Sequence, residues 1–356
     1  MSEQAPTARR ERRRLPWALL LVLAVLVGTP AYLIWSLGAP SDDTTVVEFE
    51  VSRGRGAAQI ARDLHAAGLV REPRVFLLLL RFEGMDRRVG EGLYDLHPAM
   101  RAREVAAVLR RGGRPRTVRL VVPEGQRLSD VASRLEEAGL SPLETTLARM
   151  REPDGLLPQE LLESSVAEGA TLEGYLFPAA YEVPVDEPLD AVLGRMVRRF
   201  EAELDVDTRA ELERAGLDLH TWVTLASMVQ AEAGNDSEMP IIAGVFLNRL
   251  DLGMPLQSDP TVAYGLGRDL PELDFPGGDF DVDHPWNTYT REGMPAGPIS
   301  NPGRAALNSV LDPERFDDQG RAWLYFLHGR DESGPVFRPN ADYEGHLRDI
   351  AQYLRR

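Results

Sequence analysis

A run of 24 residues without a charge, Leu15 to Gly38, follows five arginines at the start of this chain. A helix of that length spans about 36 Å, which exceeds the ~30 Å of a bilayer's hydrocarbon core. Asp42 and Asp43 follow the run, and the positive-inside rule then places the N-terminus in the cytoplasm. The sequence predicts a cytoplasmic basic tail (1–14), a transmembrane anchor (15–38) and a C-terminal body outside the cytoplasmic membrane.

A cleaved signal peptide is the alternative explanation of this run. Signal peptides have a shorter apolar region, about 7–15 residues, which ends at a site of small residues. The run here is longer than that, and the possible cleavage site after it is poor. We therefore expect an uncleaved, single-pass protein of the inner membrane that acts on the cell envelope.

Composition excludes several classes of function. The net charge of −16 argues against nucleic-acid binding, which needs a basic face. Without cysteine the chain has no disulfide, thiolate metal site or cysteine nucleophile. The six histidines show no HxxxH or HExxH spacing, and there is no GxSxG motif, P-loop or clear dinucleotide fingerprint. We expect neither a metal nor a cofactor.

An internal repeat indicates how the first half of the chain is organised. Residues 47–69 and 118–140 align without gaps and are identical at eight of 23 positions. Each copy has the pattern of a strand, a glycine turn and an amphipathic helix that ends at glycine. Between the copies the sequence predicts a second helix, a strand near Gly92 to Leu96 and a third helix.

This order of elements resembles the LysM module, a small unit that often binds the glycan of peptidoglycan. A duplication that serves packing alone is the alternative. We expect a LysM-like module at 44–116 and a second domain at 117–356, whose first part, 117–140, repeats the strand–helix unit. Residues 141–170 read as a connector with short helices, and a helical pattern returns at 187–203.

Glu232 is the main candidate for chemistry. It lies near the end of a helix predicted over 219–233, on the same face as Trp222, Leu225 and Val229. Desolvation raises the pKa of a carboxyl group, and a glutamate that keeps its proton near neutral pH can act as general acid and then as base. A solvated residue at a frayed helix end is the alternative.

The chain after Glu232 also carries capping signals. Gly234 is suited to end the helix in a left-handed cap. Asp236 or Ser237 is suited to cap a following helix that runs to about Asp251.

A second carboxylate is needed by most glycosidases, and the spacing leaves its identity open among Glu173, Glu238 and Asp259. Two polar, turn-rich loops, LQSDPTVAYGLG and NTYTREGMPAGPISNPG, carry side chains suited to sugar hydroxyl and N-acetyl groups. Ordinary turn chemistry explains such loops equally well.

The segments LEGYLFP, SMVQAEAG, VFLNRL, GMPLQSDPTVAYGLG, NTYTREGMPAGPISNPG and LYFLHG follow one another in this order. With the anchor and the LysM-like part ahead of them, the chain resembles the endolytic murein transglycosylases of the MltG (YceG-like) family. The resemblance implies an α+β fold class: a single N-terminal transmembrane helix, a LysM-like α/β module and a mixed α+β lytic transglycosylase catalytic domain.

The resemblance also implies a lyase that cuts the MurNAc–GlcNAc β-1,4 bond of nascent peptidoglycan glycan strands. The product would end in 1,6-anhydro-MurNAc, and the cut would help to terminate glycan elongation near penicillin-binding synthases. The family's catalytic glutamate falls on Glu232, which acts as acid and then as base on the sugar's own 6-hydroxyl, so no second protein carboxylate is required. The implied substrate-binding residues are Glu173, Gln257, Ser258, Asp259, Asn287, Thr288, Tyr289 and Asn301.

Three positions depart from the family's pattern. Gln230 stands where members often have an acidic residue, Pro335 replaces a histidine, and His346 comes later than the family's last histidine. These changes put a role for the C-terminal histidines in doubt. The alternative functions are a non-enzymatic, LysM-like peptidoglycan-binding protein and a hydrolytic muramidase.

Overall fold

The computed structural model of the chain describes residues 17–85, 89–153, 155–158, 161 and 170–354. The chain forms two compact units, residues 1–116 and 117–356. Helices and two-stranded antiparallel sheets occur in both units, so the mixed α+β class expected from the sequence is confirmed.

The first unit begins with helix α1 (Trp17–Ser36), which coincides with most of the uncharged run. Within the residues that the structure describes, no helix has both the length and the apolar character needed to cross a bilayer. The predicted transmembrane helix is therefore not confirmed. The basic tail (1–14) lies outside the described residues.

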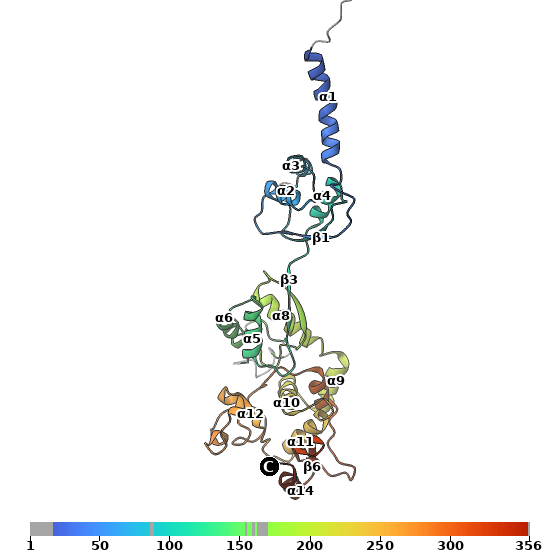
Figure 1. Ribbon diagram of the computed structural model, residues 1–356. Helices are drawn as coiled ribbons and strands as arrows, with labels where there is room; N and C mark the ends of the chain where they lie inside the picture. The colour runs from blue at the N-terminus through green and yellow to red at the C-terminus, as the bar shows by residue number, and fades with distance from the viewer. Residues whose placement is uncertain (1–16, 86–88, 154, 159–160, 162–169, 355–356) are drawn as a thin grey trace, which may run out of the picture. The chain divides into compact units, whose positions relative to one another are not determined.

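A strand–helix–helix–strand unit follows α1 and confirms the elements predicted from the repeat (Figure 1). Its two strands pair antiparallel, from Val47 opposite Leu96 to Val51 opposite Gly92. The apolar faces of its helices close one hydrophobic core over these strands. The likeness to LysM stays a prediction. The elements are β1 (Val47–Val51), α2 (Ala57–Ala66), α3 (Pro73–Phe82), β2 (Gly92–Leu96) and a further helix, α4 (Ala102–Arg111).

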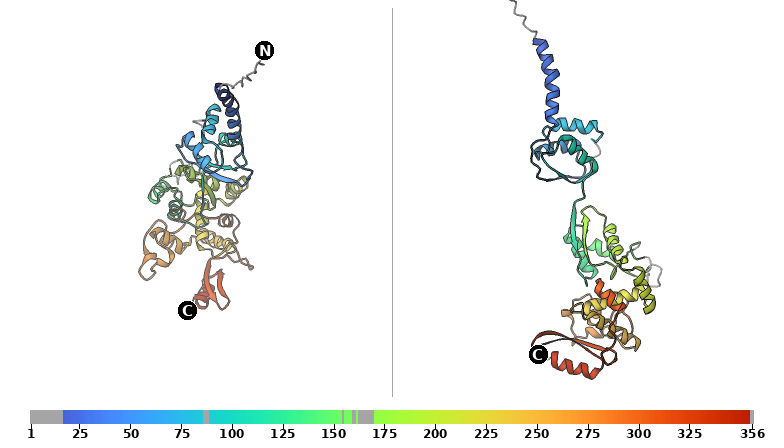
Figure 2. Two further views of the ribbon diagram at one scale, coloured as in Figure 1. Left: turned by 45° about the horizontal axis from the view of Figure 1, so that its top comes forward. Right: turned by 90° about the vertical axis from the view of Figure 1, so that its right-hand side faces the viewer.

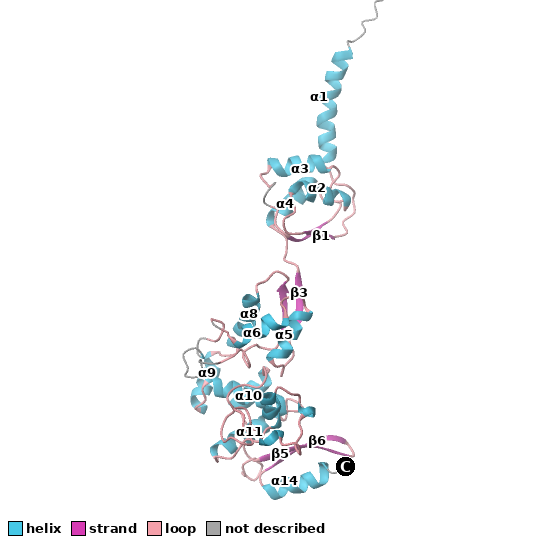
Figure 3. Ribbon diagram, turned by 90° about the vertical axis from the view of Figure 1, so that its left-hand side faces the viewer, coloured by secondary structure: helices cyan, strands magenta, loops and turns pink. Residues whose placement is uncertain are grey.

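The second unit opens with the same order of elements, which goes beyond the strand and helix that the repeat predicted. Helix α6 lies in what the sequence suggested was a connector, and strand β4 completes an antiparallel pair with β3 (Figure 3). In this copy the segment between the second helix, α6, and the second strand, β4, is longer than in the first copy. That segment contains Glu173. The elements are β3 (Thr117–Val121), α5 (Leu128–Glu137), α6 (Leu143–Arg151) and β4 (Ala180–Pro184).

The rest of the second unit is built around α10, which is buried on nearly all sides. A helix that is apolar all round belongs in a core, and α10 packs against α11, α12 and α13. The helices are α8 (Leu189–Glu201), α9 (Val206–Ala215), α10 (Leu219–Glu232), α11 (Met239–Asp251), α12 (Asp259–Leu266) and α13 (Arg304–Leu311), with 3-10 turns at Leu270–Glu272 and Asp279–Asp281.

A β-hairpin and a short helix form the last part of the second unit that the structure describes. Strands β5 (Tyr325–Asp331) and β6 (Gly334–Asn340) pair antiparallel, and α14 (Tyr343–Asp349) with a π turn (Ile350–Leu354) lies against them (Figure 2). Helix α11 holds this hairpin, because the rings of Phe246 and Phe326 meet edge to face at 6.2 Å. The hairpin thereby becomes one wall of the cavity described next.

Candidate active site

Glu232 is the last residue of α10, the central helix of the second unit. The helix begins with Asp218, whose carboxylate accepts a 2.7 Å hydrogen bond from the Thr221 amide. Trp222 anchors it by donating from Nε1 to the Leu307 carbonyl at 2.9 Å. The predicted apolar face is confirmed, since Trp222, Leu225 and Val229 are buried. A rigid, buried helix therefore holds Glu232 in place.

The chain turns sharply after Glu232, and here the sequence-based capping predictions are wrong. Gly234 does not adopt the left-handed conformation; Ala233 leaves the helix with an extended backbone. Glu238, not Asp236 or Ser237, is the residue before α11. Its carboxylate accepts from the Gly234 amide and from Asn235 Nδ2, each at 2.8 Å. The side chain of the residue just before the next helix thus closes the turn, so a left-handed glycine is not required.

The carboxyl group of Glu232 is half-buried and receives one hydrogen bond, from Ser258 Oγ to Oε1 at 2.6 Å. Burial raises the pKa of Glu232 to about 7, and the negative charge of Asp259 adds to the rise. The Ser258 hydrogen bond and the Arg249 charge oppose it. A carboxyl group balanced in this way exchanges its proton near neutral pH, as acid–base catalysis needs.

Ser258 reaches Glu232 because its loop has an unusual backbone. Gln257 has a φ of 50°, a left-handed conformation that is uncommon for residues other than glycine. Thr288 holds the loop there: its carbonyl accepts from the Gln257 amide at 3.1 Å and its Oγ1 from the Ser258 amide at 2.9 Å. Thr288 is itself buried. Thr288 therefore lies beneath the loop of Gln257 and Ser258. This geometry gives no support to the predicted contact between Thr288 and substrate.

A cavity of about 430 Å³ opens beside Glu232. Among the predicted site residues, Gln257, Asp259 and Tyr289 line it together with Glu232. The Tyr289 hydroxyl donates to Asp259 Oδ1 at 2.5 Å, and burial raises the pKa of Tyr289. The structure therefore brings a polar, acid-containing group of predicted residues around one space.

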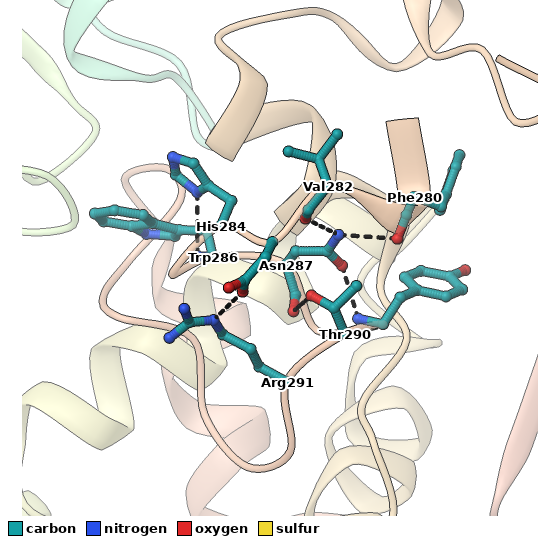
Figure 4. A network of polar contacts seen from close by, with 9 residues as sticks. Phe280, Val282, His284, Trp286, Asn287, Thr290 and Arg291 are labelled. Carbon is teal, nitrogen blue, oxygen red and sulfur yellow. Dashed lines mark hydrogen bonds and ion pairs between the residues drawn. The ribbon is translucent and has the colours of Figure 1, made fainter. Parts of the chain in front are cut away.

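Asn287 does not line this cavity. Its side chain points into the loop that precedes it, toward Phe280 and Val282 (Figure 4). Its Nδ2 donates to the carbonyls of Phe280 and Val282 at 3.0 and 2.8 Å, and its Oδ1 accepts from the Tyr289 amide at 2.8 Å. The side chain is 2% exposed. Asn287 shapes the loop that presents Tyr289, and the prediction of a sugar-binding role for it has no support here.

Glu173 and Asn301 form a second buried cluster, apart from the main cavity. Glu173 Oε2 accepts from the Leu128 amide and from Tyr264 Oη, both at 3.2 Å, and Oε1 accepts from Asn301 Nδ2 at 3.3 Å. Burial raises the pKa of Glu173 to about 8. Asn301 also joins the Leu176 amide to the Gln126 carbonyl. Both residues tie the second repeat to the core.

A smaller cavity of about 230 Å³ lies at this second cluster, with Glu173 and Tyr264 in its lining. Of the three residues that sequence left open as a second carboxylate, only Asp259 shares the cavity of Glu232. Glu238 lies behind the turn and accepts from His328 Nε2 at 2.9 Å.

Several residues of the main cavity were not predicted from the sequence. Arg249 comes from α11, and the rest come from the C-terminal hairpin and α14. His346, whose role the departures put in doubt, lines the cavity together with His328, whereas Pro335 lies near the hairpin tip opposite Arg330. The one local signal for these residues was an arginine in the largely apolar sequence of helix α11, which could have indicated that Arg249 is a site residue. The unpredicted polar and aromatic residues are Arg249, Tyr325, Phe326, His328, Tyr343 and His346.

Gln230 does not bond to Glu232. Its Oε1 accepts from the Gly303 amide at 2.9 Å, and its side chain lies near Gly125. A neutral amide there links α10 to the segment before α13, and adds no charge beside Glu232.

The arrangement is suited to one kind of chemistry. A single carboxyl group with a pKa near 7 faces a polar cavity, and the described residues include no group of three or more side chains placed to hold a metal ion. Glu232 can give a proton to a leaving oxygen and afterwards take one from an attacking hydroxyl.

Comparison with known proteins agrees with the motifs. The model of the YceG-like family matches residues 49–352. A protein named endolytic murein transglycosylase from Bacillus subtilis strain 168 is 26% identical over 299 residues, which cover 80% of this chain and 79% of that protein.

A protein of the same name from Streptococcus pneumoniae R6 is 26% identical over 326 residues, which cover 85% of this chain. The matched region spans 58% of the pneumococcal protein's length. The crystal structure of a yceG-like protein from Listeria monocytogenes superposes with a TM-score of 0.56 at 27% identity, covering 85% of this chain and 98% of that one.

Proposed function

Because the chain belongs to the YceG-like family, we propose that it is an endolytic murein transglycosylase. It would cut the MurNAc–GlcNAc β-1,4 bond of nascent glycan strands and leave 1,6-anhydro-MurNAc ends. The names of the relatives support this class of activity. The observation that carries the proposal is Glu232: a half-buried carboxyl group, its pKa raised to about 7 by burial, on the wall of a polar cavity.

The proposed reaction needs one proton donor and one proton acceptor in turn. Protonated Glu232 gives its proton to the glycosidic oxygen as the bond from that oxygen to C1 of MurNAc breaks. The 6-hydroxyl oxygen of the same sugar then bonds to C1, and its proton passes to the Glu232 carboxylate. Water is not consumed, and the enzyme ends in the protonation state in which it started.

Ser258 supports both steps. Its hydroxyl donates to Oε1 of Glu232, which stabilises the carboxylate that exists between the two proton transfers. Oε2 of Glu232 has no hydrogen-bond partner among the described residues. Oε2 is therefore free to carry the proton.

A hydrolytic muramidase is the second candidate, because Asp259 shares the cavity with Glu232. Hydrolases use a second carboxylate as nucleophile or base. Asp259 already accepts a hydrogen bond from Tyr289 on Oδ1, so that oxygen is not free to attack the sugar or a water molecule. The lyase is therefore the better supported proposal.

The test is digestion of purified sacculi, followed by mass spectrometry of the new glycan ends. Anhydro ends support the lyase, reducing ends support the hydrolase, and intact strands support a protein that only binds glycan. Glu232→Gln should abolish the anhydro ends and keep the fold. Glu213→Gln is the matched control, since Glu213 is an exposed carboxylate of the same unit outside the cavity. Cutting by Glu232→Gln at the wild-type rate would show that Glu232 is not the acid.

The cellular setting is proposed on the sequence alone. The uncharged run 15–38 after five arginines supports a single-pass anchor in the cytoplasmic membrane, with the second unit outside the cytoplasm. There the protein would work near penicillin-binding synthases and terminate glycan elongation, and the LysM-like part would hold glycan. Recovery of the full chain from the soluble fraction after alkaline carbonate extraction of membranes would exclude the anchor.

A further inference from the structure

Arg249 is a buried cation without a buried anion to match it. The residue is 7% exposed. Its Nε donates to the Leu324 carbonyl at 2.7 Å, and its Nη1 donates to the Leu256 carbonyl at 2.8 Å and the Pro255 carbonyl at 3.2 Å. These acceptors are neutral. Among the described residues no carboxylate lies within ion-pair distance of the guanidinium, and burying a charge in that way is costly.

The remaining edge of the guanidinium is open to the main cavity. Nη2 makes no hydrogen bond with the described residues. It is also not fully buried. Arg249 lines the cavity that Glu232 lines. Since Nη2 is neither paired nor enclosed, it faces the space that substrate would occupy.

Gln257 stands beside this open edge. Its Oε1 lies 3.5 Å from Arg249 Nη1, which leaves its Nε2 amide, as assigned, without a partner among the described residues. Gln257 lines the same cavity and is held in its left-handed conformation by Thr288. Two donors, one of them charged, are thus presented side by side, a pattern suited to a planar acceptor.

The charge of Arg249 also acts on the other groups of the cavity. Glu232 and Asp259 are acids on the same wall, and Tyr325 packs its ring 5.2 Å below the guanidinium carbon. The charge of Arg249 lowers the pKa of Glu232, against the larger effect of burial. An anion bound at Arg249 would offset that charge and help Glu232 to keep the proton that the first step uses.

We propose that Arg249 and Gln257 form a subsite that binds a carboxylate group of the glycan strand next to the bond that Glu232 cleaves. This inference rests on the proposed function, because the proposed substrate supplies such groups in two places. One is the lactyl group of MurNAc when no peptide is attached to it. The other is the peptide stem, which joins the lactyl group through an amide and carries free carboxylates.

The test uses three soluble oligosaccharides of the same length. The lactyl groups are free carboxylates in the first, primary amides in the second, and joined to peptide stems with free carboxylates in the third. Each is titrated calorimetrically into the full-length Glu232→Gln protein, which cannot consume it. A charge-assisted pair of hydrogen bonds should make binding roughly 10-fold tighter than for the neutral amide. Preference for the first oligosaccharide assigns the lactyl group, and preference for the third assigns the stem.

Gln257→Glu, added to Glu232→Gln, is the decisive variant. The new carboxylate removes a donor and competes for Arg249, while the bonds from Arg249 to the loop carbonyls stay in place. The preference for a carboxylate should fall below about twofold, the size of one weak surface contact. Gln319→Glu is the matched control, because it makes the same change of charge at an exposed position outside the cavity, and should keep the preference.

Three results would overturn the subsite: equal binding of all three oligosaccharides, no binding of any, or an unchanged preference in Gln257→Glu. The proposed function is judged separately, by the anhydro ends that wild-type protein releases from sacculi. If those ends appear and the preference does not, the subsite alone is wrong. If they do not appear, the proposed function fails.

Discussion

The second unit contains two glutamates with a raised pKa, one buried and one half-buried, whose surroundings differ in one decisive way. Burial raises the pKa of both, to about 8 for Glu173 and about 7 for Glu232. Glu173 is buried at the edge of the smaller cavity, and both of its oxygens already accept hydrogen bonds, from three different segments. Glu232 accepts one hydrogen bond and faces a cavity of about 430 Å³.

The difference shows that a raised pKa does not identify a catalytic residue by itself. Structural clusters perturb pKa values as active sites do. What separates the two glutamates is a free oxygen with room for substrate. Both oxygens of Glu173 accept hydrogen bonds that join the second repeat to the core, whereas one oxygen of Glu232 has no hydrogen-bond partner among the described residues.

Activity should separate the two sites most strongly. Glu232→Gln should lower the rate of anhydro-end formation by roughly 10³-fold, within the range for loss of a general acid–base group. Glu173→Gln should stay within about threefold of wild type at equal amounts of folded protein, a shift below 1 kcal/mol. Rates of release from sacculi measure both. A loss in Glu173→Gln as large as that in Glu232→Gln would end the distinction.

Stability should show the reverse order. Glu173→Ala leaves the Leu128 amide, the Tyr264 hydroxyl and Asn301 Nδ2 without their acceptor, at roughly 1–3 kcal/mol for a buried unsatisfied group. We expect urea unfolding of the second unit to show a loss of about 3 kcal/mol or more, and a smaller loss in Glu173→Gln, which keeps one oxygen. Glu232→Gln should not lower stability. Equal stability of Glu173→Ala and wild type would contradict the role of Glu173 in joining the second repeat to the core.

The pH dependence of stability should follow Glu173. Its pKa is raised from 4.5 to about 8 on folding, so between those values the folded protein holds a proton that the unfolded chain has released. Stability contributed by this group must then fall as pH rises from about 4.5 to 8, by at most about 1.4 kcal/mol per pH unit. Glu173→Gln should lower this slope in urea titrations between pH 5 and 8, most clearly above pH 7, where the raised pKa of Glu232 adds little to it. An unchanged slope would mean that another group causes it.

The pH dependence of the rate should follow Glu232. The first step needs the protonated acid, so kcat/KM should fall as pH rises through about 7, and approach tenfold per unit above it. The measurement is anhydro-end release from pH 5 to 9. An alkaline limb centred near 4.5 would mean that the acid is a solvated carboxyl group.

Ser258→Ala should give the smallest effect. Its hydroxyl lowers the pKa of Glu232 by donating to Oε1, so its removal should move the alkaline limb to higher pH, by up to about one unit, equivalent to about 1.4 kcal/mol. Ser309→Ala is the matched control, because Ser309 is a buried serine that bonds to the Ala306 carbonyl away from the cavity. A shift to lower pH would show that this hydrogen bond does not stabilise the carboxylate.

Much of the local structure could be predicted. The alternating and helical patterns of the repeat predicted β1, α2 and the strand at Gly92 to Leu96, and the apolar face of α10 predicted where Glu232 lies. These predictions succeed because side-chain period depends on the backbone of a single element. The cap after Glu232 was missed because the side chain that closes the turn comes from Glu238, the residue just before the following helix.

The sequence by itself determined the family, the helix that carries Glu232 and the strand–helix order of the repeat. Tertiary structure alone decided which polar residues meet Glu232. Ser258 reaches Glu232 and Tyr289 reaches the cavity, whereas Asn287 and Asn301 turn inward to hold loops. The C-terminal hairpin and α14 bring His328 and His346 to the same cavity. The physical reason is that a hydrophobic pattern tells which face of an element is buried. It does not tell which distant segment covers that face, and those long-range contacts decide where each polar group finds its partner.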